Sequence, residues 1–393
     1  MITEEFVETI EGKTRLLVPA TSLIKVPAKA PAFFNPSARL NRDISVLAYR
    51  TFVSDIKKND EKTFADSLSG IGARALRIAV EVPEIEEIYM NDINIIGINI
   101  AKEAARLNLV VEKCNFSAKE VCKFLTEHAT KNGKRFTVVD LDPFGSPSPY
   151  VDCVLRAVLN GGLLSLTATD TAVLSGVYPE VCFCRYYGRP LKNYYANEIA
   201  IRLIISLTAL TASRLRLAVR PLFVHANLHY FRVYVRILVS SNQANRVYDN
   251  IGYLRHCFRC GNRNVIREYD KSEACELCGG HFNVGGQLWI AQLFDKGFIK
   301  KMASCELNSS DISNNKNNDR IRKMLSTCID EIDDIPHYFR LDEIASKLKT
   351  NPCSLQKVIE KLHRIGYKVS KTSLNPRAFK TNARIDQILG ALR

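Results

Sequence analysis

Two pairs of cysteines have the spacing of a metal site. Two residues separate Cys257 from Cys260, and a glycine follows Cys260. Cys275 and Cys278 repeat this pattern. Four thiolates complete the tetrahedral shell that Zn²⁺ prefers, so we expect a structural zinc site with His256 and His281 as bystanders. A redox dithiol needs only one such pair, and a disulfide is disfavoured in a reducing compartment.

A second group of residues indicates a nucleotide site. The run 63–77 has the pattern of a strand, a turn containing Gly70 and Gly72, and the start of a helix, whose N-terminus favours anionic groups. Asp92 ends the next strand, twenty residues after Gly72, where a carboxylate can accept hydrogen bonds from both hydroxyls of a ribose. This spacing fits NAD or S-adenosylmethionine (SAM), and a tight turn without a ligand is the alternative.

The run Asp142-Pro143-Phe144 follows an apolar strand that begins at Phe136. An exocyclic amino nitrogen is a poor nucleophile because its lone pair is delocalised into the ring, until acceptors hold its hydrogens. The Asp142 side chain and the Pro143 carbonyl can supply two acceptors, and Phe144 can stack on a base. We therefore expect these three residues to be catalytic, in a loop that resembles the Asp/Asn-Pro-Pro-aromatic loop of SAM-dependent amino-methyltransferases. Asp140 competes for the role, and a proline turn without chemistry is the alternative.

The elements that hold these residues follow from the pattern of apolar positions. Strand-like runs alternate with helical patterns over about 41–240, which predicts a parallel sheet with helices on both faces. A strand pair is predicted over 4–18, ahead of an irregular lead-in segment with several prolines. The polar run Asn308 to Asp319 predicts a mobile loop.

The last 59 residues, 335–393, are strongly basic. Twelve Lys and Arg stand against four Asp and Glu there, which gives +8 of the +14 net charge of the chain. Two helical patterns around Asn351-Pro352, and a basic polar loop over 370–382, predict a winged helix-turn-helix, with a helical hairpin packed on the body as the alternative. Such an excess charge attracts polyanions, which leaves nucleic acid or an anionic membrane.

Composition limits the remaining possibilities. A length of 393 residues exceeds what one core supports, so we expect two or three domains. The apolar run Ile199 to Val219 contains Arg202, Arg214 and Arg216, which predicts that nothing crosses a membrane. The acidic N-terminus lacks the features of a signal peptide, which favours a cytoplasmic location with all twelve cysteines as thiols or metal ligands.

A basic and aromatic segment spans 185–195. It contains arginines, a lysine and four tyrosines: Arg185, Arg189, Lys192, Tyr186, Tyr187, Tyr194 and Tyr195. Such a segment can contact phosphates and stack on RNA, or it can be a packed domain junction.

Taken together, the motifs resemble those of the tRNA (guanine-N2)-dimethyltransferases, which use SAM to modify guanine 26 of tRNA. The resemblance runs from about residue 4 to residue 385. The matching segments are 34–36, 41–47, the glycine turn through Arg74 and Arg77, 91–93, 140–147, 167–170, 197–199, 229–232 and 370–383.

The resemblance implies an α/β fold: a Rossmann-like class I SAM-dependent methyltransferase domain with a C-terminal α+β domain. The expected division is an N-terminal lead-in (1–40), the SAM-binding domain (41–240) and a family-specific domain (241–393). The last contains zinc knuckles at 257–278 and a winged-helix-like, tRNA-binding region at 335–393. The implied partner is tRNA, whose guanine must leave its stack to reach SAM, and no obligate protein partner is inferred.

Carried over by position, Arg42 and Arg74 are expected at the methionine carboxylate of SAM and Asp92 at the ribose. Asn115 and Phe116 are expected at the adenine, with Asn115 replacing the aspartate that the family favours. The implied activity converts the N2 amine of guanine 26 to N2-methyl and then N2,N2-dimethylguanosine. The alternatives are an amino-methyltransferase for another RNA or DNA base, a zinc and winged-helix regulator whose sheet binds no cofactor, and an NAD-dependent dehydrogenase.

Overall fold

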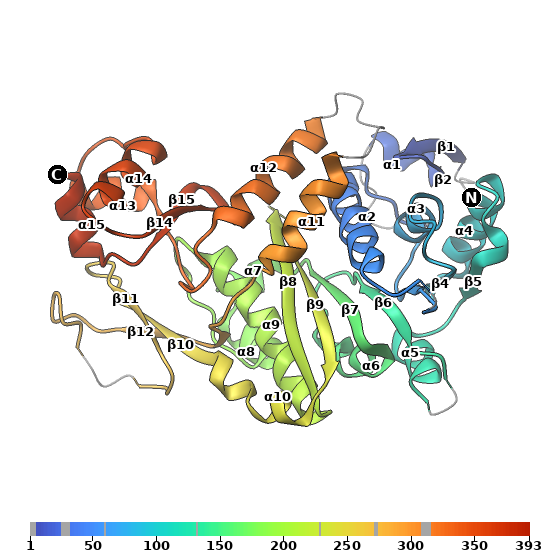
Figure 1. Cartoon of the computed structure of the whole chain (residues 1–393), viewed down its shortest axis with the longest axis horizontal. Coiled ribbons are helices and arrows are strands. Elements are labelled where there is room, and N and C mark those ends of the chain that lie inside the picture. The colour runs from blue at the N-terminus through green and yellow to red at the C-terminus, as the bar shows by residue number, and fades with distance from the viewer. Residues whose placement is uncertain are drawn as a thin grey trace.

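The structure is a computed structural model that describes residues 5–24, 32–58, 60–130, 133–227, 229–270, 274–307 and 316–393. Its centre is a seven-stranded sheet (Figure 1). In spatial order the strands are β5 (Cys114–Ser117), β4 (Glu87–Asn91), β3 (Thr63–Asp66), β6 (Phe136–Leu141), β7 (Val158–Ala168), β9 (Tyr230–Val239) and β8 (Leu217–Asn227). The first five are parallel, whereas β9 is antiparallel to both β7 and β8. The predicted parallel direction therefore holds for every strand of this sheet except β9, which runs opposite to the other six.

Helices cover both faces of this sheet. One layer contains α2 (Arg39–Ser54), α3 (Ala73–Glu81) and α4 (Ile95–Leu107), and the other contains α5 (Val121–Ala129), α6 (Val151–Ala157) and α9 (Ala196–Arg214). The strands between them are apolar because both of their faces are buried, and every residue of β6 is buried. Short helices α7 (Thr171–Leu174), α8 (Pro179–Tyr186) and α10 (Ser241–Asn245) complete this part.

The order of the strands locates the ligand crevice. The chain runs outward from β3 to β4 and β5, and then returns to place β6 on the other side of β3. Open α/β sheets bind ligands at the carboxyl ends of the strands where this reversal occurs. The glycine turn follows β3 and Asp142 follows β6, so both predicted motifs lie at the switch point.

The long apolar helix α9 belongs to the core. It is the single helix of the described residues whose length and composition would suit a membrane span, and 78% of its most apolar window is buried inside the protein. Arg202, in its middle, donates to Glu198 and to the carbonyls of Trp289 and Ala291. These partners satisfy the charge inside the fold, as a core helix requires.

The N-terminal strand pair is present as predicted, with β1 (Phe6–Glu11) antiparallel to β2 (Thr14–Pro19) and a short α1 (Ala20–Ile24) after it. At the other end of the sheet, β10 (Ile251–His256), β11 (Arg263–Ile266) and β12 (Asn283–Trp289) form a three-stranded antiparallel sheet. Helices α11 (Lys296–Leu307) and α12 (Lys316–Asp330), orange in Figure 1, then connect this region to the C-terminal one.

The C-terminal region has the predicted winged-helix arrangement. Helices α13 (Leu341–Leu348) and α14 (Leu355–Arg364) are followed by the hairpin of β14 (Val369–Thr372) and β15 (Asn375–Thr381). Strand β13 (Phe339–Arg340) pairs with β15, and α15 (Ile385–Leu392) ends the chain. These elements enclose their own apolar cluster, which includes Phe339, Leu362 and Phe379. The apolar positions that predicted two helices therefore face this small core.

Two expectations from the sequence are wrong. Lys316 to Asp319 were predicted to be loop but form the first turn of α12, whereas residues 308–315 lie outside the described residues. Cys122 on α5 and Cys153 on α6 form a disulfide, so not all twelve cysteines are thiols or metal ligands. The two cysteines are 31 residues apart, and the packing of α5 on α6 brings them together.

Candidate functional site

The turn after β3 has a backbone that only glycine adopts easily. Gly70 and Gly72 have φ of +55° and +74°, in the left-handed region. A Cβ on Gly72 would also lie 2.9 Å from the side chain of Ala101 on α4. The turn therefore packs closely against α4, and the N-terminus of α3 faces the crevice. This position suits a ligand with an anionic group.

Asp92 is joined directly to this turn. Its Oδ2 accepts from the backbone N–H of Gly70 at 2.8 Å, and its Oδ1 accepts from the N–H of Asn94 at 2.9 Å. Asn91, one residue earlier, is buried and bonds Ser67, Ser117 and Lys119. The ends of β3, β4 and β5 are thus fixed relative to one another, with the Asp92 carboxylate between them.

Asp142 lies at the end of a buried chain of charges. Arg74, at the start of α3, contacts both carboxylates of this strand end: its Nε lies 3.0 Å from Asp140, and its Nη2 donates to Asp142. Arg232 on β9 donates to Asp140 from the other side, at 2.6 Å. The side chain of Asp142 is 29% exposed, whereas Asp140 and Arg232 are fully buried. Of the two candidate carboxylates, only Asp142 is accessible from the crevice.

The charges settle the state of Asp140. Burial opposes its ionisation, but the guanidinium groups of Arg232 and Arg74 outweigh burial and hold its pKa below the ordinary value. Tyr49 on α2 also donates to it. Asp140 is therefore an ionised anchor that positions the arginines, whereas Asp142 faces the ligand side of Arg74.

A second buried carboxyl, Asp66, ends β3 directly before the glycine turn. Burial and the nearby carboxylate of Asp140 raise its pKa well above the ordinary value. An amine cation bound at this edge would favour the ionised form, because an opposite charge offsets the penalty of burial. This chemistry fits SAM, whose methionine end carries an ammonium group beside its carboxylate.

Phe144 is exposed to 79% and has one aromatic neighbour. The ring of Phe33, in the segment before α2, lies 4.9 Å from it at 84°. The loop that holds Phe144 is fixed to the end of β7, since the N–H of Gly145 donates to the Thr169 hydroxyl and the N–H of Thr169 donates to the Gly145 carbonyl. An exposed aromatic ring on a fixed loop is suited to stacking on a base.

The other predicted cofactor residues have different surroundings. Arg42 is buried, and its guanidinium forms two hydrogen bonds with Glu11 and one with the carbonyl of Asn35. Asn115 is exposed in the middle of β5, and Phe116 is half-buried. Ser117 ends that strand, and its carbonyl accepts from the N–H of Asp92. Ser117 is thus nearer to Asp92 than Asn115 is along the strand.

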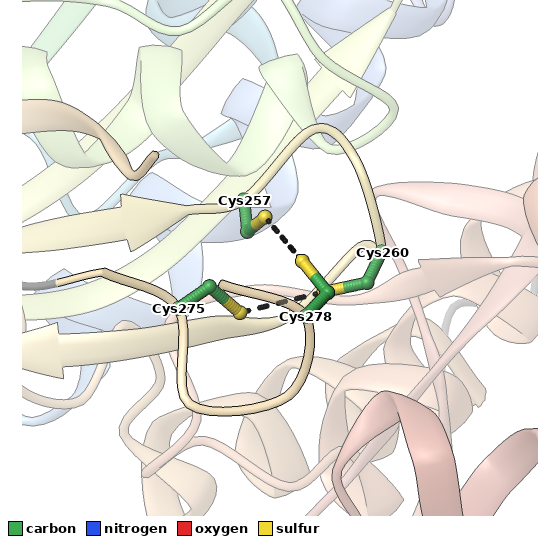
Figure 2. Close-up of side chains that lie close together, drawn as sticks. All are labelled: Cys257, Cys260, Cys275 and Cys278. Carbon is green, nitrogen blue, oxygen red and sulfur yellow. Dashed lines mark hydrogen bonds between the residues drawn. The ribbon is translucent and has the colours of Figure 1, made fainter. Parts of the chain in front are cut away.

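The four knuckle cysteines converge (Figure 2). Their Sγ atoms all lie within 4.8 Å of one another, although the two pairs come from separate turns. Gly261 N–H donates to the Cys257 carbonyl and Gly279 N–H to the Cys275 carbonyl, which closes the two turns in the same way. A tetrahedral set of four thiolates fits Zn²⁺. His256 bonds the Tyr195 hydroxyl instead, in agreement with its expected role as a bystander.

Comparison with known proteins decides the family. The family model described as N2,N2-dimethylguanosine tRNA methyltransferase matches residues 12–393. This chain belongs to that family. A tRNA (guanine(26)-N(2))-dimethyltransferase of Methanothermobacter thermautotrophicus is 35% identical over 96% of both chains. A tRNA (guanine(26)-N(2)/guanine(27)-N(2))-dimethyltransferase of Aquifex aeolicus is 37% identical over 73% of this chain and 72% of its own.

A solved structure supports the same assignment. The complex of Trm1 from Pyrococcus horikoshii with S-adenosyl-L-methionine superposes with a TM-score of 0.84 at 26% identity. The alignment covers 98% of this chain and 99% of that one. The methyltransferase fold, the C-terminal region and their arrangement are therefore those of the N2,N2-dimethylguanosine tRNA methyltransferase family.

Three residues of this site were absent from the predicted set. Asp66 immediately precedes the glycine turn and ends an apolar strand, which is the same signal that identified Asp92 and Asp142. Phe33 lies directly before the segment 34–36 that resembles the family, but nothing in the sequence pairs it with Phe144. Arg232 also lies in a matching segment, yet its contact with Asp140 joins residues 92 positions apart.

The segment 185–195 is packed in part, as one of the two predictions requires. Tyr186 and Tyr195 are fully buried, and the Tyr186 hydroxyl donates to Asp170 while accepting from Ser146. Tyr187 and Tyr194 are exposed to 58% and 45%. Tyr195 therefore packs against the C-terminal region and Tyr186 against the loop after β6, whereas Tyr187 and Tyr194 are accessible.

Proposed function

We propose that this chain transfers methyl groups from SAM to the exocyclic N2 amine of guanine 26 in tRNA, giving N2-methyl and then N2,N2-dimethylguanosine. The observation that supports this most directly is the accessible Asp142 carboxylate, held by Arg74 at the switch point of a sheet whose chain belongs to this family. Bound SAM supplies an electrophilic methyl group on a sulfonium. The roles of the protein residues follow from their positions.

The residues around the glycine turn fit SAM. Asp66 is placed to pair with the ammonium of the methionine end, and the N-terminus of α3 with Arg74 to receive its carboxylate. Asp92 is placed for the ribose, next to the Gly70 N–H. The adenine is assigned to the end of β5, where Asn115, Phe116 and Ser117 are the candidates. Arg42, which was expected at the carboxylate of SAM, donates to Glu11 and to the Asn35 carbonyl, and we assign it to positioning the segment before α2.

Asp142, Pro143 and Phe144 are assigned to the base. A carboxylate oxygen of Asp142 and the Pro143 carbonyl accept hydrogen bonds from the two amine N–H groups. The nitrogen lone pair is then less delocalised into the ring and forms the new C–N bond. The S–C bond breaks, S-adenosylhomocysteine leaves, and the surplus amine proton passes to Asp142 and then to solvent. Phe144, with Phe33 at its edge, stacks on the extruded guanine.

Zinc is assigned a structural role in the C-terminal region. The four cysteines are far from the glycine turn in the sequence, and they form a closed set of four ligands, which leaves no open position for a substrate. We also place the reaction in the cytoplasm, on the basis of its tRNA substrate.

The test is methyl transfer from labelled SAM to an unmodified tRNA transcript, followed by nucleoside analysis and mapping of positions 26 and 27. Wild type should yield dimethylguanosine at position 26. Asp142→Asn should reduce the rate by at least about 10²-fold while SAM binding persists. Asp152→Asn, which changes an exposed carboxylate on α6, is the matched control and should retain the wild-type rate. If wild type binds SAM and leaves this tRNA unlabelled, the assignment of tRNA as the substrate is refuted.

A further inference from the structure

A cavity of about 370 Å³ lies between the methyltransferase sheet and the C-terminal region. Its walls come from five parts of the chain: α2, the ends of β8 and β9, α12, the start of α14, and the β14–β15 hairpin. The residues that line it include Leu40, Ile44, His225, Tyr230, Arg320, Lys323, Met324, Thr327 and Lys371. The volume is within the range of roughly 300–1,000 Å³ that sites for small organic groups occupy.

One wall of the cavity is formed by a buried histidine. His225 is 3% exposed, and its Nε2 has no hydrogen-bond partner among the described residues. An unsatisfied buried nitrogen costs free energy, and a hydrogen-bonding group that reaches Nε2 from the cavity would remove this cost. The ring of Tyr230 stands 5.5 Å from the ring of His225, at 87°. Together with Leu40, Ile44 and Met324, these rings provide apolar surface for a flat, heteroaromatic ligand.

The rim of the cavity carries positive charge only. Arg320 and Lys323 on α12 and Lys371 on β14 are exposed, and no carboxylate of the described residues pairs with any of them. No Asp or Glu lines the cavity. Glu331, beside the hairpin, accepts from Thr372 and Ser373 and pairs with Lys380. The rim therefore favours an anionic group, such as a phosphate.

The cavity is separated from the methyl-transfer edge by one helix. Leu40 and Ile44 face the cavity from α2, while their neighbours Asn41 and Ser45 accept from Arg74, the residue that donates to Asp142. His225 is opposite Arg232 in the β8–β9 ladder, and Arg232 donates to Asp140. A group bound in the cavity thus lies beside the catalytic edge on the face covered by α2.

We propose that this cavity holds one nucleotide of the tRNA other than the methylated guanosine, with its base on His225 and its phosphate at Arg320, Lys323 and Lys371. This inference rests on the proposed function, because the nucleotide belongs to the same substrate. If the cavity binds this nucleotide, the C-terminal region and the methyltransferase sheet contact the same tRNA on either side of α12.

The first measurement is the affinity of the full-length protein for an unmodified tRNA transcript, by fluorescence anisotropy with S-adenosylhomocysteine present. Arg320→Gln/Lys323→Gln should weaken binding at least tenfold and lower the salt slope of log K by at most about one, since about 0.9 counterion is released per neutralised phosphate and these cations are assigned to one phosphate. Lys102→Gln/Lys123→Gln removes two exposed cations from α4 and α5 and is the matched control. A rim variant that binds like this control would overturn the proposal.

His225→Phe tests the base. It keeps the ring and removes the nitrogen, so tRNA affinity should fall while the salt slope and the affinity for SAM stay at the wild-type values. An unchanged tRNA affinity in a folded His225→Phe protein would contradict the assignment. If wild type methylates tRNA and these variants bind tRNA with wild-type affinity, the assignment of a nucleotide to the cavity is refuted and the proposed function stands. Wild type that neither binds nor methylates tRNA would refute the function itself.

A photocrosslinker placed at Thr327, on the cavity wall, identifies the occupant without relying on the stability of His225→Phe. The expected adduct is one nucleotide of the tRNA at a position other than 26. Absence of an RNA adduct would refute the proposal. AMP, GMP, CMP and UMP at millimolar concentration serve as competitors: if one of them occupies the cavity and the tRNA does not, the site binds free nucleotides and the proposal fails.

Discussion

The guanidinium of Arg232 lies 2.6 Å from the carboxylate of Asp140, and neither side chain is exposed to solvent. Arg74 contacts the same carboxylate and also donates to Asp142, so one buried anion aligns both arginines behind the catalytic loop. Asp140 and Asp142 are thereby linked through Arg74. The pair couples the antiparallel strand β9 to the parallel part of the sheet.

Removing one member of this pair should be costly. Arg232→Met leaves the charge of Asp140 buried with less compensation, and breaking a buried pair destabilises proteins by about 3–5 kcal/mol. Chemical unfolding measured by circular dichroism gives the value. Arg220→Met breaks the exposed pair of β8 with Asp295 and should cost at most about 1 kcal/mol. Equal losses for the two variants would show that Asp140 does not depend on Arg232.

A second buried network should hold the C-terminal region on the core. Lys380 of β15 lies 2.9 Å from Glu198 of α9 and 3.1 Å from Glu331, which follows α12, and all three side chains are buried. Lys380→Met should destabilise the protein by about 3–5 kcal/mol, as chemical unfolding would measure. Lys368→Met, an exposed change just before β14, should have little effect.

The network also predicts a partial rescue. Glu198 keeps Arg202 as a partner in Lys380→Met, but Glu331 keeps only the hydroxyls of Thr372 and Ser373 and the N–H of Ser373. Lys380→Met/Glu331→Gln should therefore be more stable than Lys380→Met alone, because it removes the uncompensated charge. A double variant less stable than the single one would contradict this account.

Local sequence signals predicted the parts of the site that depend on one strand and its turn. Asp92 and Asp142 each end an apolar run, and the four cysteines have a spacing with few other uses. The contacts that the sequence did not predict join distant segments. Arg232 with Asp140, Phe33 with Phe144, and Cys122 with Cys153 each depend on how elements pack, and no local pattern encodes that. The reversed β9 was missed because a strand buried on both faces has the same continuous apolar pattern in either direction.

Zinc should be needed for tRNA binding and not for SAM binding. The two cysteine turns, 257–261 and 275–279, and the adjoining strand β11 pack against the winged-helix-like region 335–393. Arg263 of β11 donates to Glu343 of α13, and Leu277 joins the apolar cluster of that region. Cys278→Ser should lose the metal and weaken tRNA binding, while equilibrium dialysis shows unchanged SAM affinity. Elemental analysis should give one zinc per wild-type chain. Cys184→Ser, at an exposed free thiol, should keep both the zinc and the tRNA affinity.

Acid should destabilise the protein through a buried histidine. His337 is buried between the domains, where burial and the positive charges of Arg263, Lys380 and Arg202 lower its pKa well below the ordinary value, and its Nδ1 has no partner among the described residues. Below about pH 6.5 the unfolded chain binds a proton there that the folded protein does not bind. Stability contributed by neutral His337 is therefore fully present above pH 6.5 and falls by about 1.4 kcal/mol per unit as the pH decreases.

The variant His337→Phe isolates this contribution from the other groups that titrate in acid, including the cysteine ligands. Between pH 7.5 and pH 5.5, wild type should lose about 1.4 kcal/mol more unfolding free energy than His337→Phe, from urea titrations at each pH. His229→Phe, which removes an exposed imidazole, should follow the wild-type curve. Parallel curves for wild type and His337→Phe would mean that the folded protein accommodates the imidazolium, through a rearrangement of the domain junction around Tyr195 and Phe339.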